Sequence, residues 1–271
     1  RSSAASDVYK RQVLEVGNMY PVWYTKMIYD GMTQAGDSDI VSLVRCAWAG
    51  SQRYGALVWS GDIPSTFEAL KTQIICGLQM AMSGIPWWTT DIGGFQDGDI
   101  RDPKFKELLI RWFQYGTFCP VMRLHGNRIP NKRPLSKTGG GRFGSGAENE
   151  IWSYGKENFK IMKKYIEIRE KMRSYTRRLM KESSETGAPI IRPLFYHFPN
   201  DDQSWKINDE YMYGDKVLVA PVTEYLQRKR NVYLPDGAQW LEPETGKRYS
   251  GGQTITVDAP LDIIPVFVRE D

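Results

Sequence analysis

The sequence has few of the residues that build metal sites, and it lacks the serine-hydrolase motif. Its 271 residues include two histidines, His125 and His197, without an HxxxH pair, a His-Cys cluster or an acidic triplet. The GxSxG string is absent, which removes the serine-hydrolase class. No Lys-Ser or Lys-Thr pair follows the glycine-rich stretch 139–146, as it would in a phosphate-binding loop. We therefore expect neither a metal nor a cofactor.

Long apolar runs, blocks of like charge and paired cysteines are also lacking. No segment approaches the roughly 18 consecutive apolar residues of a membrane-spanning helix, so no membrane partner is expected. The formal net charge of +4 is spread along the chain, which argues against a nucleic-acid partner. The cysteines, Cys46, Cys76 and Cys119, lie far apart and are predicted to be reduced, which favours a cytoplasmic location.

Aromatic residues, by contrast, are abundant. They make up 13% of the chain and include nine tryptophans. Because the flat faces of Trp and Tyr suit the apolar faces of sugar rings, this composition is a first hint of carbohydrate binding.

The chain divides into three parts by composition and pattern. Residues 1–12, RSSAASDVYKRQ, share no pattern with the rest of the chain and are predicted to be a non-native leader. From residue 20 to about 182, short apolar runs alternate with amphipathic stretches, which is typical of parallel βα units. From 187 onward, short β-rich runs broken by turns predict a small antiparallel β domain.

Within these parts the local signals predict individual elements. Strand patterns occur at 40–45, 56–59, 85–89 and 119–124. Helix starts are predicted at a capping box, Ser65 to Glu68, and at Asp102-Pro103, and a long helical stretch is predicted over 148–182. The aperiodic stretch 132–146 predicts a loop, either a linker or a functional loop. Hairpin turns are predicted at Asp236-Gly237 and Gly251-Gly252.

Each of the four predicted strands ends close to a polar residue. These residues are Arg45, Asp62, Asp91 and His125. In parallel α/β folds the carboxyl ends of the strands form the active site, so we expect the four side chains to converge. Any one of these aspartates could be a turn residue or a helix cap, but caps need not recur at the same end of successive strands. Neighbouring indoles, Trp59 and Trp88, would desolvate a carboxyl as a general acid requires, unless both are core residues.

The motifs together resemble glycoside hydrolase family 31, which contains α-glucosidases and α-xylosidases. The resemblance covers nearly everything after residue 20 and rests on motifs in order: LVRCAWAGSQRYGALVWSGD, GIPWWTTDIGGF, FCPVMRLHGNR, RPLFYHFP, YMYGDKVLVAPV and APLDIIPVFVR. It implies an α/β fold in which residues 13–186 form the C-terminal half of a (β/α)8 TIM barrel. Residues 187–271 would then form the proximal C-terminal antiparallel β-sandwich domain.

The resemblance also implies a role for each candidate site residue. Asp62 would be the catalytic acid/base of a retaining mechanism. Hydroxyls of the sugar on the non-reducing side of the cleaved bond would be bound by Arg45, Asp91 and His125. The walls of that subsite would be lined by Trp59, Trp88 and Phe95.

The sequence departs from the family in one respect. A retaining glycosidase needs a second carboxylate as nucleophile, and the family's nucleophile lies on the fourth barrel strand, for which no motif is found. We therefore expect it to lie outside this chain and the chain alone to be inactive. The implied activity of the full-length protein is release of terminal α-linked xylose, or glucose, from an oligosaccharide. A non-catalytic carbohydrate-binding protein is the alternative from another class, and a homo-oligomer is an open expectation.

Overall fold

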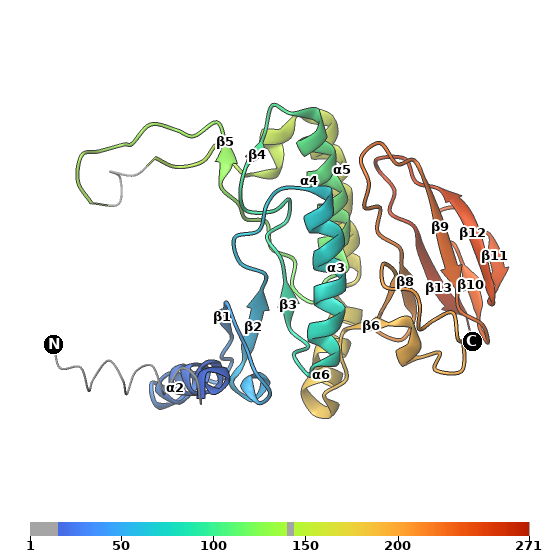
Figure 1. Ribbon diagram of the computed structural model, residues 1–271, viewed down its shortest axis with the longest axis horizontal. Coiled ribbons are helices and arrows are strands. Elements are labelled where there is room, and N and C mark those ends of the chain that lie inside the picture. Colours follow the sequence, from blue (N-terminus) through green and yellow to red (C-terminus); the bar gives the residue numbers. More distant parts are fainter. Residues whose placement is uncertain (1–15, 140–143, 271) are drawn as a thin grey trace.

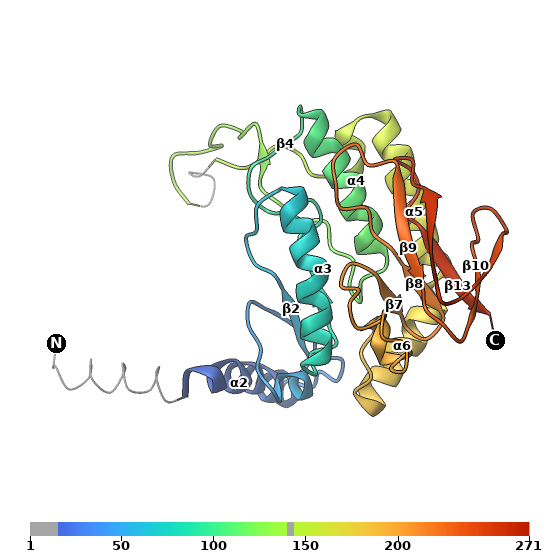
Figure 2. The same cartoon turned by 45° about the vertical axis from the view of Figure 1, so that its right-hand side comes forward.

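A computed structural model describes residues 16–139 and 144–270, so the predicted leader at 1–12 lies outside the described residues. Its helices α3 (Phe67–Met82), α4 (Pro103–Thr117) and α5 (Lys156–Lys171) stand between a short parallel sheet and an antiparallel sheet (Figure 1). The same order of layers is seen after a turn of 45° (Figure 2). None of the described helices has the length and apolar character that crossing a membrane requires.

The parallel sheet contains three of the four predicted strands. They are β1 (Ser42–Val44), β2 (Ala56–Trp59) and β3 (Trp88–Thr89), hydrogen-bonded in that order and all parallel. The connection from β1 to β2 is too short for a crossover α-helix and holds one 3-10 turn, η2 (Ser51–Tyr54). These strand predictions are confirmed, two of them over shorter ranges.

The fourth predicted strand, 119–124, is wrong as an assignment although its place is right. The segment lies beside β3, because Val121 N–H donates to the Trp88 carbonyl at 3.3 Å and Ile92 N–H to the Arg123 carbonyl at 3.2 Å. No regular strand forms there. Pro120 has no N–H to donate, which interrupts the ladder near its start.

The helix starts agree with the predicted caps to within one residue. Asp102 accepts from Lys104 N–H at 2.9 Å ahead of Pro103, as predicted. At α3 the capping side chain is Thr66, which accepts from Ala69 N–H at 3.0 Å, so the cap placed at Ser65 is one residue too early. The predicted helix 148–182 is divided into η4 (Ile151–Tyr154), α5 and α6 (Arg173–Thr186). An additional helix, α2 (Tyr20–Gln34), precedes β1.

One apolar core joins the parallel sheet to the helices. Leu70 and Ile74 of α3 and Leu109 and Trp112 of α4 are at most 1% exposed, and within each helix they recur at helical spacing to form an apolar stripe. Full burial of a side chain of this size contributes about 1.5–3 kcal/mol. These stripes fix which face of each helix meets the strands, and so they fix the strand ends relative to one another.

The C-terminal part is an antiparallel β domain of two packed sheets, as predicted. Its core contains Leu218, Leu234, Trp240 and Phe267, all buried between the sheets. The larger sheet has the order β11-β10-β13-β8-β7-β6, and the smaller pairs β12 with β9. The strands are β6 (Ile191–Pro193), β7 (Tyr211–Tyr213), β8 (Val217–Val219), β9 (Lys229–Leu234), β10 (Gln239–Leu241), β11 (Arg248–Ser250), β12 (Gln253–Asp258) and β13 (Val266–Glu270).

The two predicted hairpin turns are wrong in their connectivity. Asp236-Gly237 joins β9 to β10 and Gly251-Gly252 joins β11 to β12, and each turn passes from one sheet to the other. The hairpin in this region is β10–β11, closed by Glu242 N–H donating to the Lys247 carbonyl at 2.8 Å. A glycine pair allows a tight reversal, but it does not decide which strands pair across it.

Two arginines join α4 to the β domain. Arg111 is fully buried and donates to the carbonyls of Gln227, Ala259, Pro260 and Ile263 at 2.8–3.1 Å. Burial lowers its pKa to about 10, which leaves it charged at neutral pH. Arg228 from the β domain binds the carboxylate of Glu107, with Nη2 2.9 Å from Oε2. The barrel helix and the β domain are therefore held as one unit.

The buried carboxyl of Glu210 is expected to make the stability of the β domain depend on pH. Burial raises the pKa of its carboxyl from 4.5 to about 8, against the opposing Arg230 charge and the Tyr233 N–H. Between these two values the folded protein keeps a proton that the unfolded chain has lost, so stability falls as pH rises through this window. We expect Glu210→Gln to melt close to wild type at pH 5 and above it at pH 9.

Thermal denaturation of the complete protein at pH 5, 7 and 9 measures this difference. Glu170→Gln, which removes a carboxylate that is 60% exposed, is the control and should give a difference independent of pH. A constant difference for Glu210→Gln across the same range contradicts the assignment.

Candidate active site

Three loops at the carboxyl ends of the parallel strands are tied together by backbone hydrogen bonds. The loop after β2 meets the loop after β3, because Phe95 N–H donates to the Ile63 carbonyl at 2.7 Å and Ser65 N–H to the Gln96 carbonyl at 2.9 Å. The third loop joins them through Asn127 N–H, which donates to the Phe95 carbonyl at 2.8 Å. The loops that carry Asp62, Asp91, Phe95 and His125 thus form one connected surface.

Close packing at Gly94 explains why two of these loops can meet. Its φ of 76° lies in the left-handed region, and a Cβ there would come within 2.6 Å of the Pro64 carbonyl oxygen. Only glycine fits both the backbone angle and this approach. Gly94 therefore allows the close approach between the Asp62 and Asp91 loops.

Asp62 and Arg45 form an ion pair at the ends of β2 and β1. Arg45 Nη2 lies 2.9 Å from Asp62 Oδ1 and 3.1 Å from Oδ2, so one guanidinium nitrogen contacts both carboxyl oxygens. The Asp62 side chain is 37% exposed and that of Arg45 61%. The Arg45 guanidinium also lies over the Trp59 ring, 5.1 Å from its centroid. These three predicted residues are brought together, with the carboxyl open to solvent.

Asp91 is the buried acid of the site. Its side chain has no exposed surface and pairs through Oδ1 with Arg123, whose guanidinium lies 5.9 Å from the centroid of the Trp59 ring. Burial raises the pKa of the Asp91 carboxyl above 3.8, whereas Arg123 and His125 oppose the rise and Asp62 adds to it. The two acids therefore lie within electrostatic reach. Asp91 Oδ2 is buried without a hydrogen-bond partner among the described residues.

Phe95 and His125 complete the group. Their rings lie with centroids 5.5 Å apart and planes inclined by 34°. The contact joins the loop after β3 to the segment beside it, as expected for convergent strand ends. Six of the seven predicted site residues are thus brought into one neighbourhood.

Trp88 lies on the other face of its strand. It is 4% exposed, and its indole lies against α3 so closely that a Cβ on Gly77 would come within 2.8 Å of the ring nitrogen. The next residue on that face, Thr90, accepts from Trp112 of α4 at 2.8 Å. Trp88 therefore packs against α3, and it shares the lining of a pocket with Arg45 and Trp59 but not with either acid. Its neighbour Trp87 is partly buried and packs against the apolar core.

Two residues near the site were missed from the sequence, Arg123 and Arg128. Arg123 stands two positions before His125 in an extended segment, so the period of two was a usable signal for a shared face. Arg128 follows His125 by three positions and begins the short strand β5 (Arg128–Ile129), which pairs in parallel with β4 (Gly98–Asp99), and no periodicity points to it. Its contacts are visible only in the folded chain.

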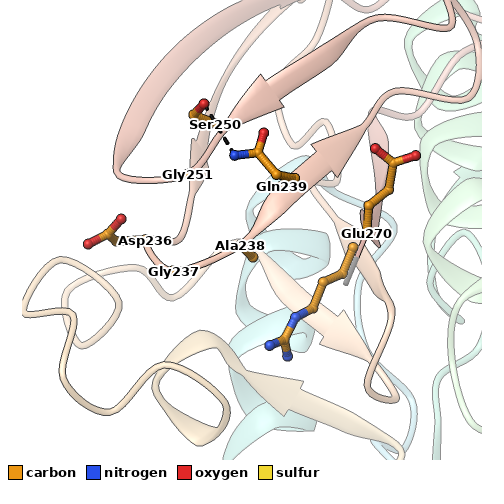
Figure 3. A pocket seen from close by; sticks show the side chains of 8 residues that line it. Asp236, Gly237, Ala238, Gln239, Ser250, Gly251 and Glu270 are labelled. Carbon is orange, nitrogen blue, oxygen red and sulfur yellow. Dashed lines mark hydrogen bonds between the residues drawn. The ribbon is translucent and has the colours of Figure 1, made fainter.

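Features elsewhere do not add to this group. In the part of the chain that the structure describes, no three His, Cys, Asp or Glu side chains are grouped to hold a metal ion. The predicted loop 132–146 is free of helix and strand where it is described. A polar pocket on the β domain, with Asp236, Gln239, Ser250 and Glu270 in its lining, contains none of the predicted residues (Figure 3).

The fold is thus part of a TIM barrel, with polar side chains gathered at its strand ends, followed by an antiparallel β domain. The family model for the "Glycosyl hydrolases family 31 TIM-barrel domain" matches residues 2–178, and the model for the "Glycosyl hydrolase family 31 C-terminal domain" matches residues 187–271. The chain belongs to glycoside hydrolase family 31.

Several relatives are similar over almost the entire chain. A crystal structure of a GH31 α-xylosidase from a soil metagenome, complexed with xylose, is 58% identical with a TM-score of 0.92, covering 95% of this chain and 38% of that one. "Alpha-xylosidase" of Saccharolobus solfataricus is 36% identical and "Alpha-glucosidase 2" of Bacillus thermoamyloliquefaciens 32% identical, each over 94% of this chain. The chain spans 33% and 30% of these two proteins, about a third of the length of its curated relatives.

Proposed function

We propose that the complete protein containing this chain is a retaining, exo-acting α-glycoside hydrolase that releases terminal α-linked xylose from oligosaccharides. The observation that carries the proposal is the meeting of two acids, two guanidiniums and one imidazole at the strand ends. A site with these groups can bind several hydroxyls of one sugar and still leave a carboxyl for proton transfer.

The proposed reaction is a double displacement. An aspartate outside this chain attacks the anomeric carbon while Asp62 gives its proton to the departing glycosidic oxygen. Asp62 then takes a proton from the water that releases the sugar with its α configuration retained. The 37% exposure of the Asp62 side chain supports this role, because both the leaving group and the water must reach it. Neither step requires a metal or a cofactor.

Substrate binding must also break the ion pair between Arg45 and Asp62. One arginine nitrogen contacts both carboxyl oxygens, so Asp62 stays oriented toward Arg45 while the pair is intact. In the proposed complex, sugar hydroxyls replace Asp62 as partners of Arg45. Asp91 accepts a hydroxyl through Oδ2, the oxygen without a partner among the described side chains. His125, with Phe95 against its ring, bonds a neighbouring hydroxyl.

One solved relative in particular supports xylose over glucose as the released sugar. The solved structure with 58% identity is an α-xylosidase holding xylose, whereas "Alpha-glucosidase 2" is 32% identical. An α-glucosidase of the same family is therefore the second candidate. A non-catalytic carbohydrate-binding protein follows only if the complete sequence has no aspartate at the nucleophile position. Assembly into a homo-oligomer stays a prediction.

Chromogenic substrates test the proposal. We expect the complete protein to hydrolyse p-nitrophenyl α-xyloside with a kcat/KM at least about tenfold above that for p-nitrophenyl α-glucoside. A wall that excludes one hydroxymethyl group supplies roughly this discrimination. The β-anomer of the xyloside is the control and should not be turned over. A preference for the glucoside moves the assignment to the second candidate. If the protein hydrolyses neither substrate, the catalytic proposal is wrong.

A further inference from the structure

Arg128 is a fully buried arginine that bonds two of the loops carrying the site. Its Nη2 donates to the Ile92 carbonyl at 2.8 Å and to the His125 carbonyl at 3.2 Å, and its Nη1 donates to the Gly94 carbonyl at 2.7 Å. Ile92 follows Asp91 and Gly94 precedes Phe95. The predicted site residues Asp91, Phe95 and His125 therefore each carry, or directly adjoin, a carbonyl that Arg128 holds.

The guanidinium lies in a closely fitting site. Its carbon lies 5.0 Å from the centroid of the Phe105 ring, and Nε donates to Asn149 Oδ1 at 3.1 Å. A Cβ on Gly126 would come within 2.4 Å of the guanidinium carbon, and one on Gly93 within 3.0 Å of Nη2. Glycines thus line the places where these loops approach the arginine most closely.

An apolar residue could fill this space without the cost of burying a charge. Desolvation of an ion costs several kcal/mol even after the protein relaxes. The planar guanidinium of Arg128 is favourable here because its N–H groups donate in several fixed directions, to carbonyls that belong to different loops. No side chain with a single donor direction could fix Ile92, Gly94 and His125 together.

We propose that Arg128 is a positioning residue for the proposed glycosidase reaction, holding the Asp91–Phe95 loop and His125 in the geometry that binds the sugar. It is buried and does not touch the substrate. The inference rests on the proposed function for its kinetic part, and on the hydrogen bonds alone for its structural part.

The test compares Arg128→Met and Arg128→Lys with Arg111→Lys in the complete protein. Arg111 is the matched control, because it is also fully buried and bonded to backbone carbonyls but lies at the β-domain contact. A displacement of the site loops by about 1 Å can reduce the rate about 100-fold. On the preferred aryl glycoside, we expect kcat/KM to fall about 100-fold for Arg128→Met and about tenfold for Arg128→Lys. For Arg111→Lys we expect a fall of less than twofold, even where its melting temperature drops as much as that of the Arg128 variants.

Amide hydrogen exchange supplies a readout that does not depend on activity. Exchange in 92–96 and 125–128 should accelerate in the Arg128 variants and not in Arg111→Lys. If Arg128→Met does not fold, Arg128→Lys decides both measurements. Retention of kcat/KM within twofold by a folded Arg128 variant, or faster exchange outside these loops only, overturns the inference. If wild type hydrolyses no glycoside, the proposed function fails while the exchange comparison still decides the positioning role.

Discussion

Replacing Asp62 with alanine should lower turnover of a natural oligosaccharide by about 10²–10⁴-fold, which is the contribution of a positioned general acid. Without a proton the departing sugar oxygen is a poor leaving group, and the variant has no carboxyl at position 62 to supply that proton. Aryl glycosides with activated leaving groups need no proton and should suffer less in the first step. Azide should then restore part of their turnover, because it attacks the glycosyl intermediate without a general base.

Asp215→Ala is the matched control for this variant. Asp215 is also ion-paired with an arginine, Arg178, and its side chain is 36% exposed, against 37% for Asp62. It lies in the β domain, after β7, so its loss should leave kcat/KM within about twofold. Near-wild-type turnover of natural oligosaccharides by Asp62→Ala contradicts the acid/base assignment. So does an equal loss in the control.

The second large effect is expected for stability. Arg111→Met should destabilise the protein by about 3 kcal/mol, since the buried Ala259 carbonyl and three partly buried carbonyls lose their donor, and an unsatisfied buried acceptor costs about 1–3 kcal/mol. The carbonyls belong to the segments around Gln227 and 259–263, which come from the β domain. The contact between α4 and that domain should therefore loosen first. The melting temperature is expected to fall by a few degrees, since a given loss of stability shifts it less in a longer chain.

Arg248→Met is the control for this prediction. The Arg248 side chain is 66% exposed and paired with Glu270, and an exposed ion pair contributes at most about 1 kcal/mol. Thermal denaturation of both variants of the complete protein measures the difference. Equal melting temperatures would show that Arg111 contributes little. Hydrogen exchange should also rise in 103–117 in Arg111→Met only.

Local patterns in the sequence predicted most of the barrel elements and the position of the candidate site. Apolar runs and caps located three parallel strands and two helices, and the polar strand ends located Arg45, Asp62, Asp91 and His125. The strand and helix predictions hold because side chains alternate along a strand and recur every 3.6 residues along a helix. The roles of the four polar residues stay predictions. The same alternation, applied strictly, assigns Trp88 to the helix side with Thr90.

The errors fell where local pattern carries no information on partners. Pro120 broke a strand that its apolar neighbours predicted. The Asp-Gly pair at 236–237 and the Gly-Gly pair at 251–252 predicted turns, but the strands on either side of each turn lie in different sheets. Which strands become neighbours depends on packing across the whole domain, and a two-residue turn does not determine it.

The sequence by itself determined the elements, their order and the residue types at the strand ends, because these depend on local periodicity and on residue chemistry. The tertiary structure alone decided the pairing of Arg45 with Asp62 across 17 positions and of Arg123 with Asp91 across 32. It also decided that Arg128 holds the carbonyls of two loops. Such contacts arise only when packed helices bring distant loops together, so no local pattern specifies them.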